Sequence, residues 1–357
     1  MKTAVVILNW NTKGFLEEFL PGLLDSVRGE DACVIVADSA STDGSMEMMQ
    51  ERFPEVRTII LDRNYGFTGG YNRALAQVDA EYYVLINSDI EVTQGWLRPL
   101  TEWMDAHPDC GACGPKLRSW QDRGRFEYAG AAGGRIDRWG YPFCRGRILS
   151  RTEEDKGQYD SPADVFWATG ACLMTRSVLW RELGGLDDRF FAHMEEIDYC
   201  WRLQLEGWRV CCVPASVVYH VGGGTLPKSS PWKLKLNYRN NLLMLYNNLA
   251  RSYAASGEVP KKALAHARRT IFWRKCLDGL SAAVYLLTGR FKDFRAVWDA
   301  HREAGRLRTR TDAQALAQWR EAHPGARLAG LYLGSVVLAS LLKGKRVFDY
   351  IESKMVL

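Results

Sequence analysis

Short β-rich runs alternate with helical patterns at the start of the chain, and this alternation constrains the fold more than any other feature. Nearly continuous apolar or β-branched runs occupy residues 4–8, 33–37, 57–61 and 82–86. Helical spacing fills 15–23 and 69–77, and residues 41–45 mark the start of a further helix. Strands that are apolar on both faces are typical of parallel sheets covered by helices. The order therefore predicts an α/β fold with a doubly wound, mostly parallel sheet.

Polar residues follow each of the four expected strands. They occupy positions 9–11, 38–41, 64–66 and 87–89. Ligands bind doubly wound sheets at the carboxyl ends of the strands. We therefore expect these four corners to form one binding site.

The corner Asn87-Ser88-Asp89 ends an apolar strand with one carboxylate. A hard divalent cation prefers oxygen ligands and shares them with substrate phosphates, so Asp89 is a candidate ligand. A simple helix cap is the alternative interpretation.

Residues 62–72 carry glycines just before a helical pattern. Such glycines permit close approach of the backbone to a bound group, and a helix N-terminus favours an anion. The spacing is not GxGxxG, which disfavours a nicotinamide-dependent dehydrogenase. A glycine-rich turn with a helix cap is the alternative.

Three carboxylates, Glu195, Glu196 and Asp198, follow an aromatic pair at 190–191. On a helix Glu195 and Asp198 share a face, and Asp198 can pair with Arg202. Crowded carboxylates raise one another's pKa, which prepares one of them for proton abstraction. The alternative is a solvated acidic helix start, and the neighbouring aromatic residues argue against it.

His220 ends a β-rich run at 217–220, and glycines follow at 222–224. This histidine is either a hydrogen-bonded core residue or the partner of Asp89 in a metal site. In the second case the glycines suit a loop that gates substrate.

Taken together, these motifs resemble glycosyltransferase family 2, the inverting, nucleotide-sugar-dependent enzymes with a GT-A fold. The resemblance extends from residue 5 to about residue 225 and includes the segment 167–171. The nearest subgroup is the bacterial rhamnosyltransferase-like enzymes of surface polysaccharide synthesis, which Arg-Asn-Asn at 239–241 also resembles. The resemblance implies transfer of a sugar, rhamnose favoured, from a nucleoside diphosphate to a hydroxyl of a glycan or polyprenyl-diphosphate-linked glycan. A nucleotide-sugar-binding protein without turnover is the alternative.

The resemblance also implies roles for individual positions. Donor binding is implied for Asn9, Trp10, Asn11, Asp38, Ser39, Asn64, Gly66, Gly70, Asn87 and Ser88. The acceptor side is implied for Trp167, Gly170 and Ala171, and Mg²⁺ or Mn²⁺ binding for Asp89 with His220.

Among the carboxylates, the resemblance implies that Glu196 is the catalytic base, with Glu195 as its rival and Asp198 in the same catalytic group. The family commonly has Glu-Asp where this chain has Glu-Glu, and Asn87 replaces the first aspartate of Asp-x-Asp.

The charge of the chain is unevenly distributed. Residues 1–226 hold 23 Lys and Arg against 33 Asp and Glu, whereas residues 227–357 hold 24 against 9. We therefore expect two domains, a catalytic one over 1–226 and a basic, mainly helical one over 227–357. Basic residues among aromatic and apolar ones favour an anionic membrane surface over nucleic acid as the partner. A helical bundle with a solvated basic face is the alternative.

Two further expectations concern location and order. The longest uncharged apolar run, 328–342, is shorter than the roughly 20 residues that span a bilayer, and the N-terminus does not resemble a signal peptide. These features predict a cytoplasmic protein, peripheral at the inner face of the cell membrane. Residues 118–162 lack periodicity, which predicts a partly ordered insertion, and no clear strand is expected from 232 onward.

Overall fold

The computed structural model describes residues 1–222 and 230–355, and a mixed nine-stranded sheet lies at its centre. The main path of this sheet runs β11-β13-β6-β12-β4-β1-β2-β3, and β5 pairs with the end of β13. The strands are β1 (Thr3–Asn9), β2 (Ala32–Asp38), β3 (Arg57–Ile60), β4 (Tyr82–Ile86), β5 (Ile90–Val92), β6 (Cys110–Ser119), β11 (Ala163–Asp164), β12 (Cys172–Arg176) and β13 (Arg209–His220).

The first four strands pair in parallel, as predicted. β1 lies between β2 and β4, with Asn9 opposite Asp38 and Ile7 opposite Ile86. β12 then runs antiparallel to both β4 and β6, which makes the sheet mixed. This register brings the carboxyl ends of β1, β2 and β4 to one edge of the sheet.

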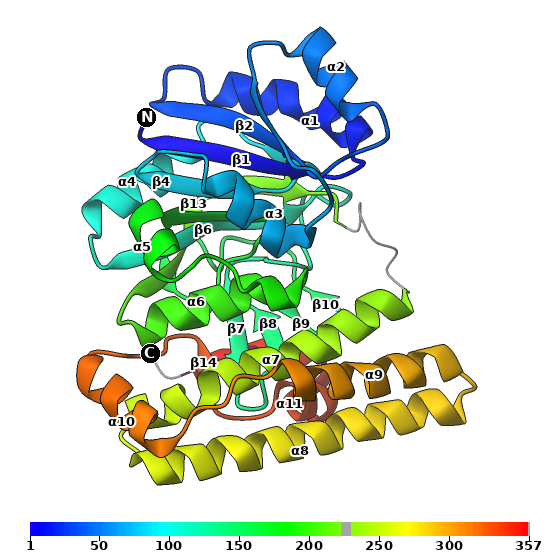
Figure 1. Ribbon diagram of the computed structural model, residues 1–357, viewed down its shortest axis with the longest axis vertical. Helices are drawn as coiled ribbons and strands as arrows, with labels where there is room; N and C mark the ends of the chain where they lie inside the picture. The colour runs from blue at the N-terminus through cyan, green and yellow to red at the C-terminus, as the bar shows by residue number, and fades with distance from the viewer. Residues whose placement is uncertain (223–229, 356–357) are drawn as a thin grey trace.

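Helices cover both faces of the sheet (Figure 1). Ala4 and Val6 belong to one apolar core, whereas Val5 and Ile7 belong to the other. Burial on both faces explains why residues 4–8 of β1 are all apolar, and the predicted fold class is confirmed. The helices of this part are α1 (Lys13–Ser26), α2 (Ser45–Arg52), α3 (Gly66–Leu75), α4 (Leu97–Ala106), α5 (Ser177–Glu182), η1 (Asp188–Phe190) and α6 (Glu195–Leu205).

The segment 118–162 is more ordered than predicted, because it contributes four short strands to a second sheet in the order β10-β9-β8-β7-β14. Its strands are β7 (Gly134–Asp137), β8 (Pro142–Cys144), β9 (Arg147–Ile148), β10 (Arg151–Thr152) and β14 (Leu331–Tyr332). Strands of two to four residues are too short to show a period in the sequence. Since β14 comes from the C-terminal part, the expectation of no strand beyond 232 was wrong.

The sequence pattern also predicts strands at 165–169, 208–213 and 217–220, and all three need correction. Residues 165–169 form no strand, and only an isolated bridge joins Trp167 to Gly134. The runs 208–213 and 217–220 belong to the single strand β13, whose register with β6 shifts between Cys212 and Val217.

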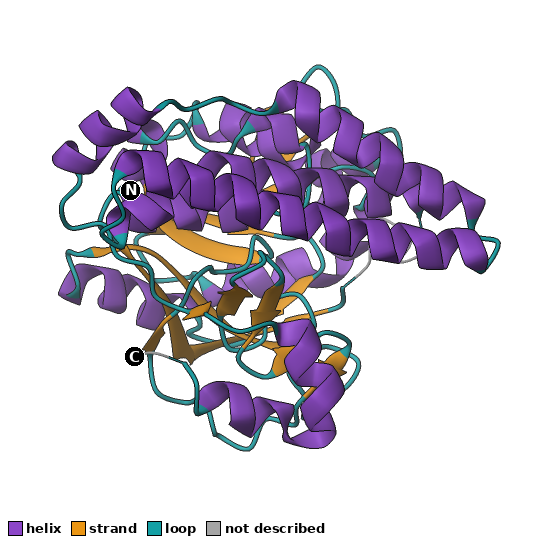
Figure 2. Cartoon of the chain, turned by 90° about the horizontal axis from the view of Figure 1, so that it is seen from below, coloured by secondary structure: helices purple, strands orange, loops and turns teal. Residues whose placement is uncertain are grey.

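Helices dominate the C-terminal part, as predicted. They are α7 (Pro231–Ala255), α8 (Pro260–Leu287), α9 (Phe291–Leu307), α10 (Ala313–Ala322), α11 (Val336–Lys343), η2 (Gly344–Arg346) and α12 (Val347–Glu352). α7 packs against α6, and α8 and α9 pack against α7. Seen from below, long helices run across the molecule (Figure 2). The predicted domain boundary at 226 lies outside the described residues. Within 1–222 and 230–355, no helix is long and apolar enough to span a bilayer.

Candidate active site

The carboxyl ends of β1 and β2 hold a buried polar pair. The Asn9 side chain donates a hydrogen bond from Nδ2 to Oδ1 of Asp38 at 2.7 Å and accepts one from the Thr12 hydroxyl at 2.5 Å. The other carboxylate oxygen of Asp38 accepts from the backbone N–H of Ser41 at 2.9 Å. Both side chains of the pair are buried, so their orientation is fixed by the fold. The structure thus brings Asn9 and Asp38 together, while their part in donor binding stays a prediction.

The chain turns outward beyond this pair. The Trp10 side chain is exposed, and Asn11 adopts a left-handed backbone conformation with φ of 54°. Asn11 stabilises the turn, because its Oδ1 accepts a hydrogen bond from the backbone N–H of Thr42 at 2.7 Å. The buried hydroxyl of Ser39 has no partner among the described residues. This corner therefore combines an exposed indole with a buried, unpaired hydroxyl.

The glycines of the α3 segment permit close packing. Asn64 accepts a hydrogen bond from the backbone N–H of Gly66 at 2.7 Å. A Cβ on Gly66, whose φ is +72°, would lie 2.5 Å from Phe191 in the loop before α6. A Cβ on Gly70 would lie 2.7 Å from Leu8 of β1. Gly70 therefore lets α3 approach β1, while its contact with the donor stays a prediction.

Asp89 and His220 meet at the end of β4, as predicted. Oδ1 of Asp89 lies 3.2 Å from Nε2 of His220, and Oδ2 accepts a hydrogen bond from the backbone N–H of Gly222 at 3.2 Å. Asn87 and Ser88 stand at the same corner and are partly exposed. Burial raises the pKa of Asp89, but hydrogen bonding and the charge of His220 outweigh it and hold the pKa below its ordinary value. Asp89 is therefore an anion at neutral pH.

Glu127 is a residue of this site that the sequence did not reveal. Its Oε1 lies 3.3 Å from Nδ1 of His220, within ion-pair distance but without the alignment of a hydrogen bond. Burial lowers the pKa of His220, but the charges of Glu127 and Asp89 and the hydrogen bond to Asp89 raise it overall to about 10. Two carboxylates thus hold the imidazole from both sides. Glu127 precedes the second sheet and follows no recognisable motif, so only the fold places it here.

Glu195 and Glu196 stand at the first turn of α6, with one oxygen of each carboxylate buried and unpaired among the described residues. Burial raises the pKa of Glu196 to about 7, even though nearby backbone N–H groups lower it. Burial and the charge of Glu196 raise the pKa of Glu195 well above its ordinary value. Buried carboxylates without partners destabilise a fold, so this pair is best explained by function.

Gly170 and Ala171 connect the two groups of carboxylates. The carbonyl of Ala171 accepts a hydrogen bond from the backbone N–H of Asn87 at 2.9 Å. A Cβ on Gly170 would lie 3.5 Å from Cβ of Glu196. The corner that carries Asp89 is therefore joined to Glu196 through only two residues, Ala171 and Gly170.

Trp167, the third predicted acceptor residue, lies in the core. Its side chain is buried, and its Nε1 donates to the carbonyl of Arg135 at 3.0 Å. A Cβ on Gly134 would lie 2.1 Å from the indole ring. The indole therefore packs against β7 of the second sheet, while its contact with an acceptor stays a prediction.

Asp198 also has a structural role. It pairs with Arg202 at 2.8 Å, as predicted, but its other oxygen accepts hydrogen bonds from Asn247 at 3.0 Å and Asn248 at 2.8 Å. Both asparagines belong to α7, and Asp198 is fully buried. Asp198 therefore anchors α6 to α7, while its place in the catalytic group stays a prediction.

The loop that leads into α6 is strained and is held by α7. Phe191, His193 and Met194 all have positive φ, which is costly for side chains of this size. The Asn240 side chain donates hydrogen bonds to the carbonyls of Phe190 at 2.9 Å, Ala192 at 2.7 Å and His193 at 2.7 Å. α7 thus fixes the backbone from which Glu195 and Glu196 project.

Replacing Asn240 with alanine is expected to loosen this loop. The carbonyls of Ala192 and His193 lose their side-chain donor, whereas that of Phe190 keeps Arg239 and the backbone N–H of Ala192. The free energy of unfolding should therefore fall by about 2–4 kcal/mol. Sugar transfer should fall at least about tenfold, mainly in kcat, because the carboxylates lose their orientation. Chemical denaturation and steady-state kinetics measure the two effects. Asn237→Ala, one turn earlier, removes only a hydrogen bond to Lys233 of the same helix and is the control. Equal effects of both substitutions would contradict the role of Asn240.

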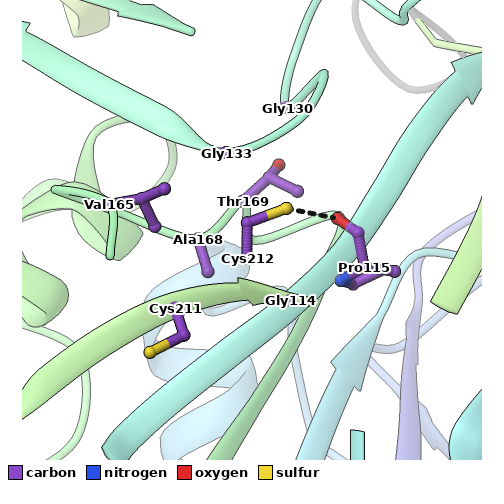
Figure 3. Close-up of a pocket in the computed structure, with 9 residues that line it drawn as sticks. All are labelled: Gly114, Pro115, Gly130, Gly133, Val165, Ala168, Thr169, Cys211 and Cys212. Atoms are coloured by element: carbon purple, nitrogen blue, oxygen red, sulfur yellow. Dashed lines mark hydrogen bonds between the residues drawn. The ribbon is translucent and has the colours of Figure 1, made fainter. Parts of the chain in front are cut away.

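Two cavities have linings that include neither Asp89 nor Glu195 nor Glu196. The smaller one, next to the register shift of β13, has a volume of about 10 Å³, so it admits one water molecule at most (Figure 3). Its lining includes Gly114, Thr169 and Cys212, whose Sγ donates to the carbonyl of Pro115 at 3.8 Å. The larger one, about 420 Å³, lies between α6, α7 and residues 309–311. The small cavity is too small for a sugar nucleotide.

Comparisons with known proteins agree with this geometry. The model of the family described as glycosyl transferase family 2 matches residues 4–181. The chain is 29% identical over 231 residues to an N-acetylglucosaminyl-diphospho-decaprenol L-rhamnosyltransferase of Mycobacterium tuberculosis, which covers 60% of this chain and 75% of the relative. It is 30% identical over 95 residues to the rhamnosyltransferase WbbL of Escherichia coli K12, covering 26% of this chain and 36% of that one.

A solved structure confirms the fold. The crystal structure of GalNAc-T7 with UDP, GalNAc and Mn²⁺ superposes with a TM-score of 0.53 at 15% identity. The match covers 76% of this chain, and the chain spans 54% of that protein's length. The arrangement is thus the GT-A fold, and the chain belongs to glycosyl transferase family 2, in its bacterial rhamnosyltransferase-like subgroup.

Proposed function

We propose that this protein is a metal-dependent, inverting glycosyltransferase that moves a sugar from a nucleoside diphosphate to a hydroxyl group. One observation carries the proposal: Glu195 and Glu196 each keep one buried carboxylate oxygen without a partner among the described residues, and only Ala171 and Gly170 separate Glu196 from the corner that holds Asp89. A proton acceptor and a candidate cation ligand thus belong to one structural unit. Transfer of a sugar from a diphosphate needs both.

Asp89 and His220 carry an oxygen and a nitrogen of the kinds that bind Mg²⁺ or Mn²⁺. The two atoms lie 3.2 Å apart and both side chains are buried; because the pKa of His220 is about 10, the ring holds a proton that a cation would displace on binding. Within the described ranges, no group of three or more His, Cys, Asp or Glu side chains is arranged to hold a metal. Such a two-residue site needs additional ligands from a substrate diphosphate, as is usual for Mg²⁺. When bound, the cation would neutralise the charge that develops on the leaving diphosphate.

The residues of the chain perform the remaining steps. Asn9 and Asp38 fix the corner where the base and ribose bind, with the exposed Trp10 beside them. Glu196 removes the proton from the attacking hydroxyl, and its pKa near 7 suits a general base at neutral pH. Glu195 is the rival for this role. The hydroxyl oxygen bonds to the anomeric carbon as the bond to the diphosphate breaks, so a single displacement inverts that centre.

The relatives suggest the substrates and the location. Two of them are named as rhamnosyltransferases, and one name specifies a diphospho-decaprenol-linked N-acetylglucosamine acceptor. We extend both features to this chain: rhamnose as the sugar and a polyprenyl-diphosphate-linked glycan as the acceptor, in surface polysaccharide synthesis. The catalytic domain then spans 1–226, and the basic part from 227 associates with the inner face of the cell membrane. Nucleic acid is not a partner in this proposal.

Release of nucleoside diphosphate tests the proposal. The protein is incubated with a panel of nucleoside-diphosphate sugars, Mn²⁺ and a lipid-diphosphate-linked N-acetylglucosamine. We expect release that depends on acceptor, together with a glycosylated lipid of inverted configuration by NMR. Donor binding without release would instead support the alternative, a nucleotide-sugar-binding protein without turnover.

Glu127 should strengthen metal binding through His220. A carboxylate beside a metal-binding histidine orients the ring and raises its basicity. Glu127→Gln keeps the shape but removes the charge, so the affinity for Mn²⁺ in the presence of UDP should fall about tenfold. Electron paramagnetic resonance of free Mn²⁺ measures this without any turnover. Glu153→Gln, which changes another partly buried carboxylate, is the control. An unchanged Mn²⁺ affinity in Glu127→Gln would remove Glu127 from the site.

A further inference from the structure

The outer side of α8 is apolar over its last four turns. Exposed residues there are Phe272, Trp273, Cys276, Leu280, Ala283, Val284 and Leu287, which we call the α8 apolar face. At about 100° per residue these positions fall on one side of the helix. No charged side chain of this stretch is exposed. A soluble helix normally presents polar residues on this side, so the α8 apolar face needs a partner.

The opposite side of α8 fixes the rotation of the helix. Arg274 is buried, pairs with Asp278 at 2.9 Å and donates to the carbonyl of Trp139 at 3.1 Å. Asp278 also lies 3.2 Å from Nε2 of His301 in α9. These buried polar contacts cannot turn outward without a large cost, so the α8 apolar face stays exposed.

Basic residues surround this face. Between 260 and 302 the exposed charged residues are all cationic: Lys261, Lys262, Arg268, Arg269, Arg290, Lys292, Arg295 and Arg302. The acidic residues of that stretch are buried or half-buried, and two of them pair with Arg290 and Arg295. On α9, the exposed Phe291 and Trp298 alternate with these cations. The surface thus combines apolar, aromatic and cationic groups.

Two occupants could cover such a surface, a second copy of the chain or a lipid bilayer. A symmetric dimer through this face would bring the same cations of both copies together, and no exposed acid between 260 and 302 would compensate. A bilayer with anionic lipids accepts aromatic and aliphatic side chains at its interface and attracts the surrounding cations. The chemistry of the face therefore favours the bilayer.

We infer that the α8 apolar face, together with Phe291 and Trp298 of α9, docks onto an anionic bilayer surface. The tip of the α8–α9 hairpin points to the same side of the molecule as the carboxyl ends of β1 and β2 (Figure 1). Docking there would hold the candidate active site on the side from which a lipid-linked acceptor approaches. The choice of acceptor rests on the proposed function, whereas the docking face rests on the surface itself.

Vesicle binding by the full chain tests the inference. Trp273, Leu280 and Leu287 are seven residues apart on one line of the helix and are exposed, so their joint replacement by alanine should preserve the fold. We expect the unaltered protein to co-sediment with phosphatidylcholine vesicles that contain about 30% phosphatidylglycerol, and less with phosphatidylcholine alone. The triple variant should partition at least about tenfold less. Ile60→Ala with Val178→Ala, which removes exposed apolar groups elsewhere, is the control and should bind normally.

A probe on Cys276 adds a local measurement. This is the one exposed cysteine of the chain, since the other eight are buried or half-buried. An environment-sensitive fluorophore on it should shift to the blue with anionic vesicles, and brominated lipids should quench it.

Three outcomes would contradict the inference. Equal binding by the triple variant would exclude this face, and no binding by the unaltered protein would exclude the bilayer. A change of oligomeric state in the triple variant, seen by analytical ultracentrifugation, would identify a second copy as the occupant. Transfer to a detergent-solubilised acceptor should be unchanged in the triple variant. If the unaltered protein binds vesicles but transfers no sugar, the proposed function is contradicted, whereas the docking face remains supported.

Discussion

Replacing Glu196 with glutamine should lower the rate of sugar transfer by about 10³-fold, because general-base catalysis typically contributes 10²- to 10⁴-fold. Glutamine has nearly the same shape but cannot take the proton of the acceptor hydroxyl. Donor affinity should be unchanged, since the carboxylate does not lie at the Asp89 corner. Single-turnover rates and calorimetric titration with UDP and Mn²⁺ measure the two quantities separately.

Glu195→Gln is the matched variant, because Glu195 is the rival base at the adjacent position. We expect a smaller decrease, through the changed pKa of its neighbour. If Glu195→Gln abolishes transfer while Glu196→Gln retains it, the two roles are exchanged. If both variants turn over normally, neither carboxylate is the base.

Glu196→Gln should also stabilise the protein, by an amount that depends on pH. Burial raises the pKa of Glu196 in the folded protein to about 7, so the carboxylate costs folding free energy where it is ionised. This cost is absent below the unfolded pKa, grows as the pH rises from there to about 7, and is complete above it. Glu196→Gln should therefore gain on the order of 2 kcal/mol at about pH 8 and little at about pH 4. Chemical denaturation at both pH values measures this difference, and an equal gain at both would contradict the assigned pKa.

Replacing Asp89 with asparagine should abolish metal-dependent donor binding. Asn keeps the shape and one oxygen but removes the charge that attracts the cation and pairs with His220. The affinity for UDP with Mn²⁺ should fall at least about 100-fold, whereas any binding without metal should persist. Thermal shift with UDP, with and without Mn²⁺, measures the loss, since binding to the native state raises Tm.

Glu91→Gln is the control for Asp89→Asn. Glu91 is two residues away on β5 and pairs with Arg123 on the surface at 2.6 Å. It should bind UDP and Mn²⁺ like the unaltered protein. Undiminished metal-dependent binding in Asp89→Asn would contradict the cation assignment.

The sequence predicted the parts of this molecule whose residues are governed by near neighbours. β4 has the predicted bounds, because Tyr82 to Ile86 are buried on both faces and no polar position interrupts them. The pair Asp198–Arg202 was likewise predictable from helical spacing. The meeting of Asp89 with His220 required the fold that the family motifs implied.

Other features depend on contacts that no local pattern encodes. Asp198 belongs to the predicted catalytic group, but one of its oxygens accepts hydrogen bonds from Asn247 and Asn248, which lie far away in the sequence. Glu127 reaches His220 only because a short, irregular segment leads into the second sheet. Trp167 and Gly70 fit the family pattern, yet both positions pack against other parts of the core.

Anomalous diffraction from crystals grown with Mn²⁺ and UDP, dTDP or GDP would test the central claim most directly. The account predicts a manganese peak bound to Asp89 and His220, with the diphosphate against it and a Glu196 carboxylate facing the same open space. The account would be contradicted if the metal and the nucleotide bound at another edge of the sheet and Glu196 did not face the space that they occupy.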